Sequence, residues 1–193
     1  RTQIMQNTLQ LNRGDGTWAE IAQLAGVYAS EWSWGVVFTD VDLDGYEDLI
    51  VASGMTRDFM DADTTAHFEN RVEARREDFP KLATQNALFR NRGDLTFKYM
   101  SDDWGFTEKA VSGGLIQADF DGDGDLDLIF NNWNTPLEIY RNETTAPRIA
   151  VKLLGHGTNT QAIGAKVRLL GGPGGTAPME HEVHVGGGYA SGS

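Results

Sequence analysis

Two acidic stretches of the chain carry aspartates at the same spacing. The second runs from Asp119 to Asp127 and reads Asp-Phe-Asp-Gly-Asp-Gly-Asp-Leu-Asp, with Gly124 directly after its third aspartate. Five carboxylates this close repel one another unless a cation lies among them. Oxygen ligands at loop positions one, three, five and nine, with a main-chain carbonyl at position seven, suit a hard cation with the size and flexible geometry of calcium. The chemistry that this stretch favours is therefore calcium binding.

The same pattern occurs earlier in the chain. Residues Asp40 to Asp48 repeat the aspartate positions with an offset of 119 − 40 = 79 residues. A solvated acidic loop without metal is the alternative for either stretch alone, but two copies in register favour the metal site. An EF-hand would place a glutamate at position twelve and helices on both sides. Position twelve of the second loop is instead Phe130, and the flanking segments 115–118 and 128–130 are mostly apolar. We therefore expect each loop to join two buried strands.

The offset of 79 residues holds well beyond the loops. Residues 12–15, which read Asn-Arg-Gly-Asp, fall on residues 91–94 with the same sequence, and Gly35 falls on Gly114. Internal self-similarity of this length indicates a repeat architecture. The expected short strands are 8–12, 17–21, 35–39 and 48–52 in the first copy, 87–91, 96–100, 114–118 and 127–131 in the second, and 137–142, which resembles 87–91. Four short strands per unit, none able to bury both faces alone, predict an all-β fold that contains part of a β-propeller.

An insertion of about residues 56–84 separates the two copies. Within it, residues 61–79 are rich in helix formers, with acidic residues near the start, arginines toward the end and Pro80 as a stop. Phe68, Val72 and Phe79 lie on one helical stripe. We expect a surface helix that packs on a blade, with a partner-binding helix as the alternative.

The composition of the chain changes after Pro147. Segments 149–154, 165–170 and 181–185 alternate in polarity as strands do and are joined by glycine-rich connections. We therefore expect blades in residues 1–146 and a small β domain in residues 147–193. The last residues do not complete a strand pattern, so we expect that domain to be incomplete.

Composition limits the functions that the chain can have. The formal net charge of −12 argues against nucleic acid and anionic membranes as partners. Two calcium ions would change it to −8, so the expected metal ligands account for part of the negative charge. The chain has no cysteine, which excludes disulfides and thiolate chemistry. It also has no apolar run of the length that a membrane-spanning helix needs.

These motifs resemble a known family. The two aspartate loops, each followed by Leu-Ile, and the Asn-x-Gly-x-x-Thr-aromatic hairpins before them resemble the FG-GAP or VCBS repeats of integrin α-chain propellers. The tail, with residues 163–167 and 186–191, looks like an ASPIC/UnbV domain, and the combination is similar to bacterial relatives of cartilage acidic protein. The resemblance implies a propeller of about seven blades, secretion, and interaction rather than catalysis. Because the chain holds about two blades, the parent chain or another copy would supply the rest.

The resemblance also implies the ligands of two calcium ions. The first set is Asp40, Asp42, Asp44, Asp48 and the main-chain carbonyl of Tyr46; the second is Asp119, Asp121, Asp123, Asp127 and the main-chain carbonyl of Asp125.

Three functional hypotheses follow from these observations. The first is a non-catalytic, calcium-binding extracellular module for interaction with protein or carbohydrate, for adhesion or for scaffolding. The alternative is a calcium-dependent enzyme that acts on polysaccharide, or the accessory binding part of one. No pairing of a nucleophile with a base is recognisable, and no catalytic residue is proposed. The third is an adhesive ligand, because residues 13–15 and 92–94 both read Arg-Gly-Asp, although a Gly-Asp turn is needed there in any case.

The tryptophans could form a sugar-binding surface. Trp18 matches Phe97 in the repeat and is expected in the core, whereas Trp32, Trp34 and Trp133 lie near loops and are better candidates for a surface.

Overall fold

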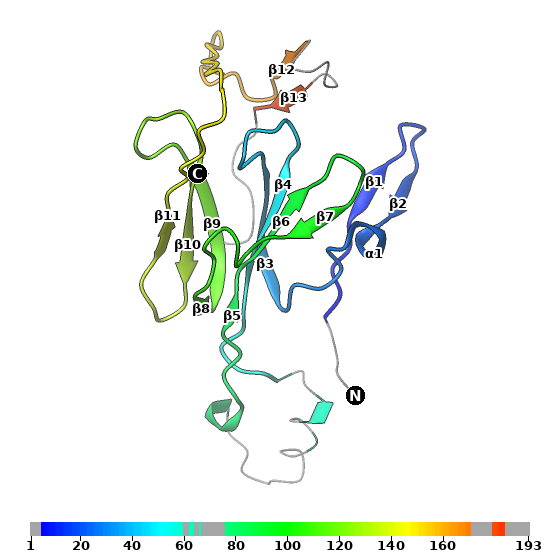
Figure 1. Ribbon diagram of the computed structural model, residues 1–193, viewed down its shortest axis with the longest axis vertical. Coiled ribbons are helices and arrows are strands. Elements are labelled where there is room, and N and C mark those ends of the chain that lie inside the picture. Colours follow the sequence, from blue (N-terminus) through cyan, green and yellow to red (C-terminus); the bar gives the residue numbers. More distant parts are fainter. Residues whose placement is uncertain (1–4, 60–61, 64–65, 67–75, 171–178, 184–193) are drawn as a thin grey trace.

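The computed structural model describes residues 5–59, 62–63, 66, 76–170 and 179–183. Nearly all of the regular structure in these residues is strand (Figure 1). The helical elements with defined bounds are the single turn α1 (Ala22–Ala25) and the 3-10 turn η1 (Arg76–Asp78). The prediction of an all-β fold is confirmed.

The centre of the molecule is a four-stranded antiparallel sheet, which we call the central blade. Its strand order is β3 (Ser33–Thr39), β4 (Asp48–Ser53), β6 (Ala87–Asn91) and β7 (Phe97–Tyr99). The first acidic loop joins β3 to β4, and the insertion leaves from the opposite end of the sheet between β4 and β6 (Figure 1).

Smaller sheets surround the central blade. A three-stranded sheet consists of β9 (Ser112–Ala118), β10 (Asp127–Asn132) and β11 (Glu138–Tyr140), with the second acidic loop between β9 and β10. The remaining pairs are β1 (Gln10–Asn12) with β2 (Trp18–Glu20), β5 (Thr84–Gln85) with β8 (Lys109–Ala110), and β12 (Lys166–Leu169) with β13 (Met179–Glu182).

The sequence repeat and the sheets are out of phase. The hairpin β1–β2 is equivalent to β6–β7, yet β6 pairs with β4 of the preceding acidic loop. One repeat therefore contributes the outer hairpin of one blade and the inner strands of the next. Besides the pairs β5–β8 and β12–β13, the described chain comprises one complete blade, a hairpin before it and a three-stranded sheet after it. This agrees with a partial propeller, and the described residues do not close a ring.

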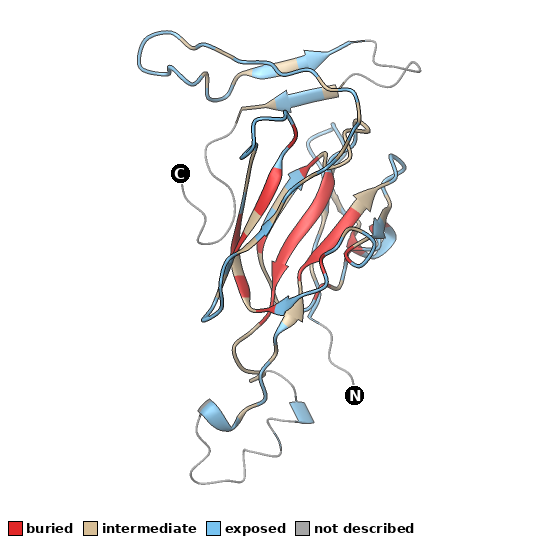
Figure 2. Ribbon diagram, turned by 60° about the vertical axis from the view of Figure 1, so that its left-hand side comes forward, coloured by how far each residue is buried: buried red, intermediate tan, exposed pale blue. Residues whose placement is uncertain are grey.

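The two faces of the central blade support separate cores. Buried residues lie along the strands in the middle of the molecule (Figure 2). Because side chains alternate along a strand, Leu49 and Val51 of β4 pack with α1, whereas Ile50 and Ala52 pack toward the three-stranded sheet. On that side Phe130 is completely buried. The blade is thus held from both sides, as a unit with two apolar faces requires.

Two expectations about individual segments were wrong. Residues 149–154 form no strand with any described residue, and Ile149 and Leu154 are 75% and 79% exposed. Their alternating pattern suits a strand, but no neighbouring strand supplies hydrogen bonds. Trp18 is 61% exposed rather than in the core. It lies in a two-stranded sheet, whereas the equivalent Phe97 lies in a hairpin that extends the central blade and packs on its core.

Several other expectations fall partly or wholly outside the described residues. Of the predicted helix 61–79, the structure describes residues 62–63 and 66, which are helical, and residues 76–79. The last of these segments contains η1 and Phe79, whose ring lies 5.3 Å from that of Phe59. The tail motif at residues 186–191 lies outside the description, and the domain boundary at residue 147 stays a prediction. Trp133 is 64% exposed, while Trp32 and Trp34 stack on each other and are half-buried. Within the part of the chain that the structure describes, no helix has the length and apolar character to cross a bilayer.

Gly54 provides a test of how closely the blades pack. Its φ is +118°, and a Cβ there would lie 2.5 Å from the carbonyl oxygen of Ala110, next to the three-stranded sheet. We expect Gly54→Ala to lower the free energy of unfolding by at least about 2 kcal/mol, because backbone strain and overlap add. Urea denaturation measures this change.

Gly113→Ala is the matched control. Gly113 lies nearby on β9, and a Cβ there would meet no atom within 4 Å. Equal stability losses in the two variants would contradict the close approach of the blades at Gly54.

Candidate calcium sites

Each acidic loop connects the first two strands of a sheet, and both loops lie at the same end of the molecule (Figure 1). In the first loop, one carboxylate oxygen each from Asp40, Asp42 and Asp48 lies within 4.8 Å of the others. In the second loop, Asp119, Asp121 and Asp127 meet the same condition. The structure therefore brings loop positions one, three and nine together in both copies.

The first aspartate of each loop closes the turn through main-chain hydrogen bonds. Asp40 accepts from the N–H groups of Asp44 at 3.0 Å and Gly45 at 2.8 Å. Asp119 repeats these bonds with the loop residues 79 positions later, at 3.1 Å and 3.0 Å. The glycine in each turn has a left-handed φ, +97° at Gly45 and +93° at Gly124, which glycine adopts at low energetic cost.

The aspartate at loop position nine connects the loop to the third strand of its sheet. Asp48 is fully buried and accepts hydrogen bonds from the N–H groups of Val41 at 3.1 Å and Asn91 at 2.8 Å. Asp127 is 2% exposed and accepts from Phe120 at 2.9 Å and Asn142 at 2.8 Å. These bonds connect the start of the loop, the start of the second strand and the end of the third.

Burial makes Asp48, at position nine of the first loop, a weaker acid. Desolvation raises the pKa of the Asp48 carboxyl to about 7, although the N–H groups of Asn91 and Val41 oppose this shift. Desolvation also raises the pKa of Asp40, more than its hydrogen bonds from Gly45 and Asp44 lower it. A cation among these groups would favour their ionised forms.

An arginine pairs with the aspartate at position three of each loop. Arg90 Nε lies 2.5 Å from Asp42 Oδ2, and its Nη2 lies 2.6 Å from Asp44 Oδ2. Arg141 Nε lies 2.8 Å from Asp121 Oδ2 at the equivalent place. The other oxygen of Asp42, Oδ1, is buried and has no hydrogen-bond partner among the residues that the structure describes.

These residues fit a hard divalent cation. Three convergent carboxylate oxygens are the donors that calcium prefers, and the buried Oδ1 of Asp42 is left available while Oδ2 is held by Arg90. Contacts such as that between Arg90 and Asp42 orient the ligands around a metal.

The residues at loop positions five and seven are not part of the two carboxylate triads. Asp44 and Asp123 each accept an N–H bond from the residue two positions later, at 2.9 Å and 3.2 Å. The ring of Tyr46 packs on the hairpin turn at Gly93. The side chain of Asp125 is buried. The main-chain carbonyls of Tyr46 and Asp125 stay predicted ligands.

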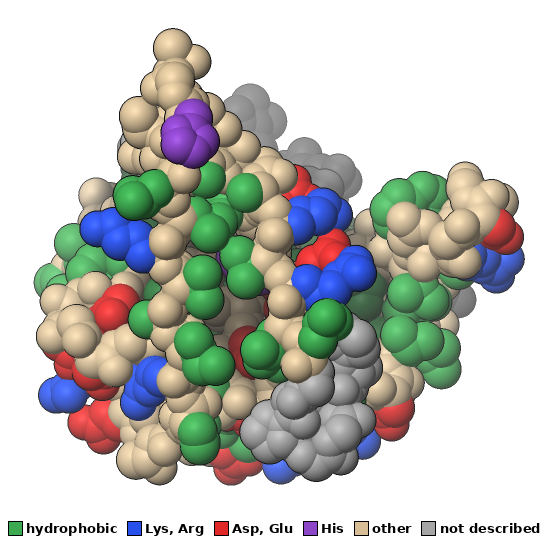
Figure 3. Space-filling model, turned by 90° about the horizontal axis from the view of Figure 1, so that it is seen from above, with side chains coloured by type: hydrophobic (Ala, Val, Ile, Leu, Met, Phe, Trp, Pro, Cys, Tyr) green, Lys and Arg blue, Asp and Glu red, His purple; other side chains and the backbone are tan. Residues whose placement is uncertain are grey.

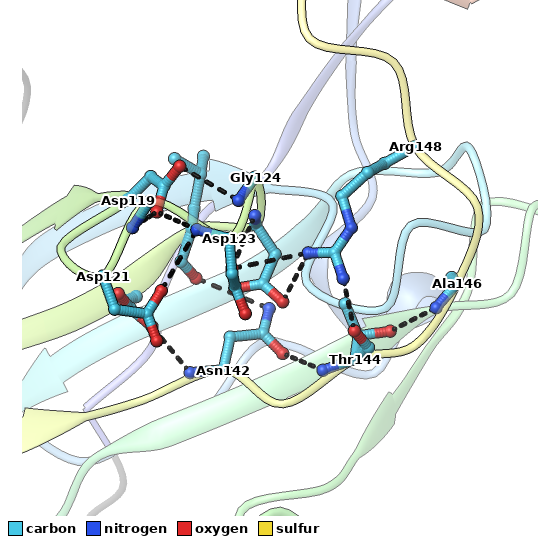
Figure 4. Close-up of polar contacts among 12 residues, drawn as sticks. Asp119, Asp121, Asp123, Gly124, Asn142, Thr144, Ala146 and Arg148 are labelled. Atoms are coloured by element: carbon cyan, nitrogen blue, oxygen red, sulfur yellow. Dashed lines mark hydrogen bonds and ion pairs between the residues drawn. The ribbon is translucent and has the colours of Figure 1, made fainter.

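Arg148 reaches the second loop from the segment after β11 (Figure 4). Its Nη1 lies 2.8 Å from Asp125 Oδ2 and 3.6 Å from Asp123 Oδ1, and its Nη2 donates to the carbonyl of Thr144 at 2.7 Å. Arg148 also passes so close to Gly124 that a Cβ there would lie 3.2 Å from its Cδ.

The first loop faces the hairpin β12–β13 instead. A Cβ on Gly45 would lie 3.2 Å from Met179 Sδ, and Glu47 Oε1 lies 3.8 Å from His181 Nδ1. The segment after residue 147 therefore contacts both acidic loops.

Sequence reasoning missed the residues that support the carboxylates. They are Arg90, Asn91, Arg141, Asn142 and Arg148. A signal was present, because an Arg-Asn pair ends both 87–91 and the similar segment 137–142. Arg148 belongs to no repeated motif, so no pattern pointed to it.

Comparison with known proteins agrees with this geometry. Residues 2–51 match the model of a family described as the FG-GAP-like repeat. That range contains the hairpin β1–β2, strand β3, the first acidic loop and most of β4. Residues 2–51 are thus similar to an FG-GAP-like repeat, and the predicted resemblance to this repeat is confirmed over that range.

Two curated relatives match part of the chain. Cartilage acidic protein 1 from Homo sapiens is 37% identical over 65 residues, and that from Xenopus tropicalis is 34% identical over 65 residues. Each match covers 33% of this chain and 10% of the relative. The chain thus spans about a tenth of the length of these relatives, and the predicted similarity to cartilage acidic protein holds over that length.

The raised pKa of Asp48 predicts a pH-dependent stability in calcium-free protein. The folded-state pKa of about 7 lies above the unfolded value of about 3.9. Between these values the folded state binds more protons, so the contribution of Asp48 to the free energy of unfolding falls as the pH rises. The slope should approach about 1.4 kcal/mol per pH unit, measured by urea denaturation with a calcium chelator present.

Asp48→Asn isolates this contribution, because the amide keeps the shape and cannot ionise. The difference in unfolding free energy between the wild type and this variant should change between about pH 4 and pH 7. A difference that stays constant over this range would show that burial does not perturb Asp48.

The position of Arg148 predicts that its removal changes calcium binding in the second loop. Its charge lies against Asp123 and Asp125, outside the carboxylate triad. Removing that charge should favour a cation in the second loop, so we expect Arg148→Gln to tighten calcium binding there by about three- to tenfold. Calorimetric calcium titration measures this effect. Arg168→Gln is the control, because Arg168 pairs with Glu180 within the hairpin β12–β13 rather than with an aspartate of the second loop. Weaker calcium binding in Arg148→Gln would give Arg148 a positioning role instead.

Proposed function

We propose that this chain is part of a non-catalytic, calcium-stabilised extracellular module that binds or scaffolds other molecules. The observation that supports this most directly is the pair of carboxylate triads at repeat-equivalent positions, 79 residues apart. Each triad joins strands of one sheet, so its occupation would act on the shape of the blade and on the loops at that end.

The residues of each loop suggest how calcium would act. When bound, calcium would offset the repulsion among the clustered carboxylates. Asp40 and Asp119 fold the turn, Asp42 and Asp121 are oriented by arginines, and Asp48 and Asp127 anchor the third strand. Sites built on exposed loops suit the millimolar calcium outside cells, with Kd of about 10⁻⁴ to 10⁻³ M. The FG-GAP-like repeat and the likeness to cartilage acidic protein 1 support an extracellular location.

The outer face of the three-stranded sheet supports the proposal that further blades cover it. Ile116 and Ile139 both flank Ile129 in the strand register, and they are 47% and 66% exposed. A row of apolar side chains across three strands is a surface that another sheet can bury. The occupant would be a blade of the parent chain or of another copy.

The Arg-Gly-Asp tripeptides have a structural role in this chain. Asp15 Oδ1 accepts hydrogen bonds from the N–H and hydroxyl of Thr17, and Asp94 does the same with Thr96. These contacts lower the pKa of both carboxyls, through the threonine hydroxyl first and then its N–H. The tripeptides therefore stabilise hairpin turns, and this arrangement favours the interaction module over the adhesive ligand.

The first test is calcium titration by calorimetry, with thermal melting followed in parallel. We expect two sites, and at about 10 mM calcium each should stabilise the fold by about 1.4 to 2.7 kcal/mol. Asp42→Asn should abolish the first site, Asp121→Asn the second, and the double variant both.

Glu108→Gln is the control, because it removes one exposed acidic charge outside both loops. It should leave both sites unchanged. If the double variant binds calcium as the wild type does, the aspartate loops are not the sites. If millimolar calcium neither binds nor stabilises the wild type, the proposed function is wrong.

A further inference from the structure

A cavity of about 700 Å³ lies between the central blade and the three-stranded sheet. We propose that this cavity binds an uncharged saccharide unit, and that calcium in the acidic loops strengthens the binding. The inference deepens the proposed function and rests on it for the calcium dependence. The volume is within the range of about 300–1,000 Å³ that is usual for small-ligand sites.

The floor of the cavity is apolar and largely aromatic. Trp104, Phe106, Leu128 and Tyr140 contribute to it. The rings of Phe106 and Tyr140 stack in parallel, with centroids 4.3 Å apart and an interplanar angle of 3°. Phe106 is 4% exposed and packs in the core between the blades, so the floor is fixed before any ligand arrives. The flat face of an aromatic ring is a platform for the C–H face of a sugar ring.

The rim of the cavity is charged but balanced. It contains the basic residues Arg90, Lys98 and Arg141 and the acidic residues Asp42, Asp103 and Glu143. Several are paired with each other, as Lys98 is with Asp103 at 3.5 Å. Seen from the end that carries the loops, basic and acidic side chains lie among hydrophobic ones (Figure 3).

This rim selects against other ligand classes. An anion would meet three carboxylates, and a cation would meet three basic groups, so neither gains from net charge. A wholly apolar ligand would desolvate charged groups without replacing their hydrogen bonds. A hydroxyl group both donates and accepts hydrogen bonds, so a ring with several hydroxyls can use the alternating donors and acceptors. An aromatic floor beneath such a rim therefore favours an uncharged saccharide.

The cavity is connected to both acidic loops. Val41 and Asp42 of the first loop and Leu126 of the second line it. Asn142 joins them, because its Nδ2 donates to the carbonyl of Val41 at 2.8 Å while its N–H donates to Asp127 Oδ1. Calcium that fixes the loops would thus fix the rim, and a preorganised rim binds more tightly.

Saturation-transfer NMR with a panel of neutral disaccharides tests the proposal. The probes are cellobiose, maltose, lactose and mannobiose, each with excess calcium and with excess chelator. We expect at least one probe to bind in calcium, and binding to weaken severalfold in chelator. Calcium binding is measured on the same sample by calorimetry, so that the two proposals are judged separately.

Three variants locate the binding. Trp104→Leu keeps an apolar side chain but removes the aromatic platform, and it should weaken the binding by about tenfold. Lys98→Met removes a donor from an exposed side chain of the rim and should weaken it by about fivefold without a risk to folding. Trp133→Leu removes an exposed tryptophan that does not line the cavity and should leave the binding unchanged.

The outcomes separate the two proposals. If calcium binds and stabilises the protein but no probe binds, the saccharide inference is overturned and the proposed function stands. Binding that survives both Trp104→Leu and Lys98→Met lies elsewhere and also overturns the inference. Binding of equal strength in calcium and chelator, with both loops occupied in calcium, overturns the coupling. If calcium does not bind but a probe does and depends on Trp104, the cavity assignment is supported and the proposed function is wrong.

Discussion

The structure depends on the buried carboxylate at position nine of each acidic loop. Asp48 and Asp127 are almost inaccessible to solvent, and each joins the start of its loop to the end of the third strand through two main-chain N–H groups. A buried carboxylate is costly unless hydrogen bonds or a cation compensate it. The N–H bonds supply part of that compensation, and a cation bound among the remaining carboxylates would supply more.

The sequence could predict the strands because each has a local pattern. The segment 87–91 and β6 have identical bounds, and the inner strands agree within about two residues at each end, the usual uncertainty of strand boundaries. Trp18 could not be placed in the same way, because its burial depends on which sheet its hairpin joins. Repeat equivalence with Phe97 describes the hairpin itself, whereas exposure depends on the strands beside it. For the same reason the alternating residues 149–154 do not become a strand, since pattern alone does not provide a neighbour.

The candidate site divides in a similar way. Its carboxylates could be predicted because they come from nine consecutive residues, so the local turn alone brings Asp40, Asp42 and Asp48 together. The arginine that orients Asp42 is 48 residues away and arrives only through the pairing of β6 with β4. The spacing of residues along the chain is therefore enough to predict a ligand loop. The groups that orient its ligands cannot be predicted in this way, because the order of strands in the sheet determines which residues reach the loop.

The two loops show which acidic residues serve the blade and which serve the C-terminal segment. The acids of the triads occur in both loops, and those at position three share equivalent partners, Arg90 with Asp42 and Arg141 with Asp121. Each loop also has an acid without an equivalent, Asp125 in the second and Glu47 in the first. Asp125 pairs with Arg148, and Glu47 lies near His181, both from the segment after residue 147. Both acids without an equivalent in the other loop therefore meet the C-terminal segment, and in the second loop the repeated Asp123 lies near Arg148 as well. A cation in either loop would change the field at that contact as well as within the blade, because these groups lie within a Debye length of the triads.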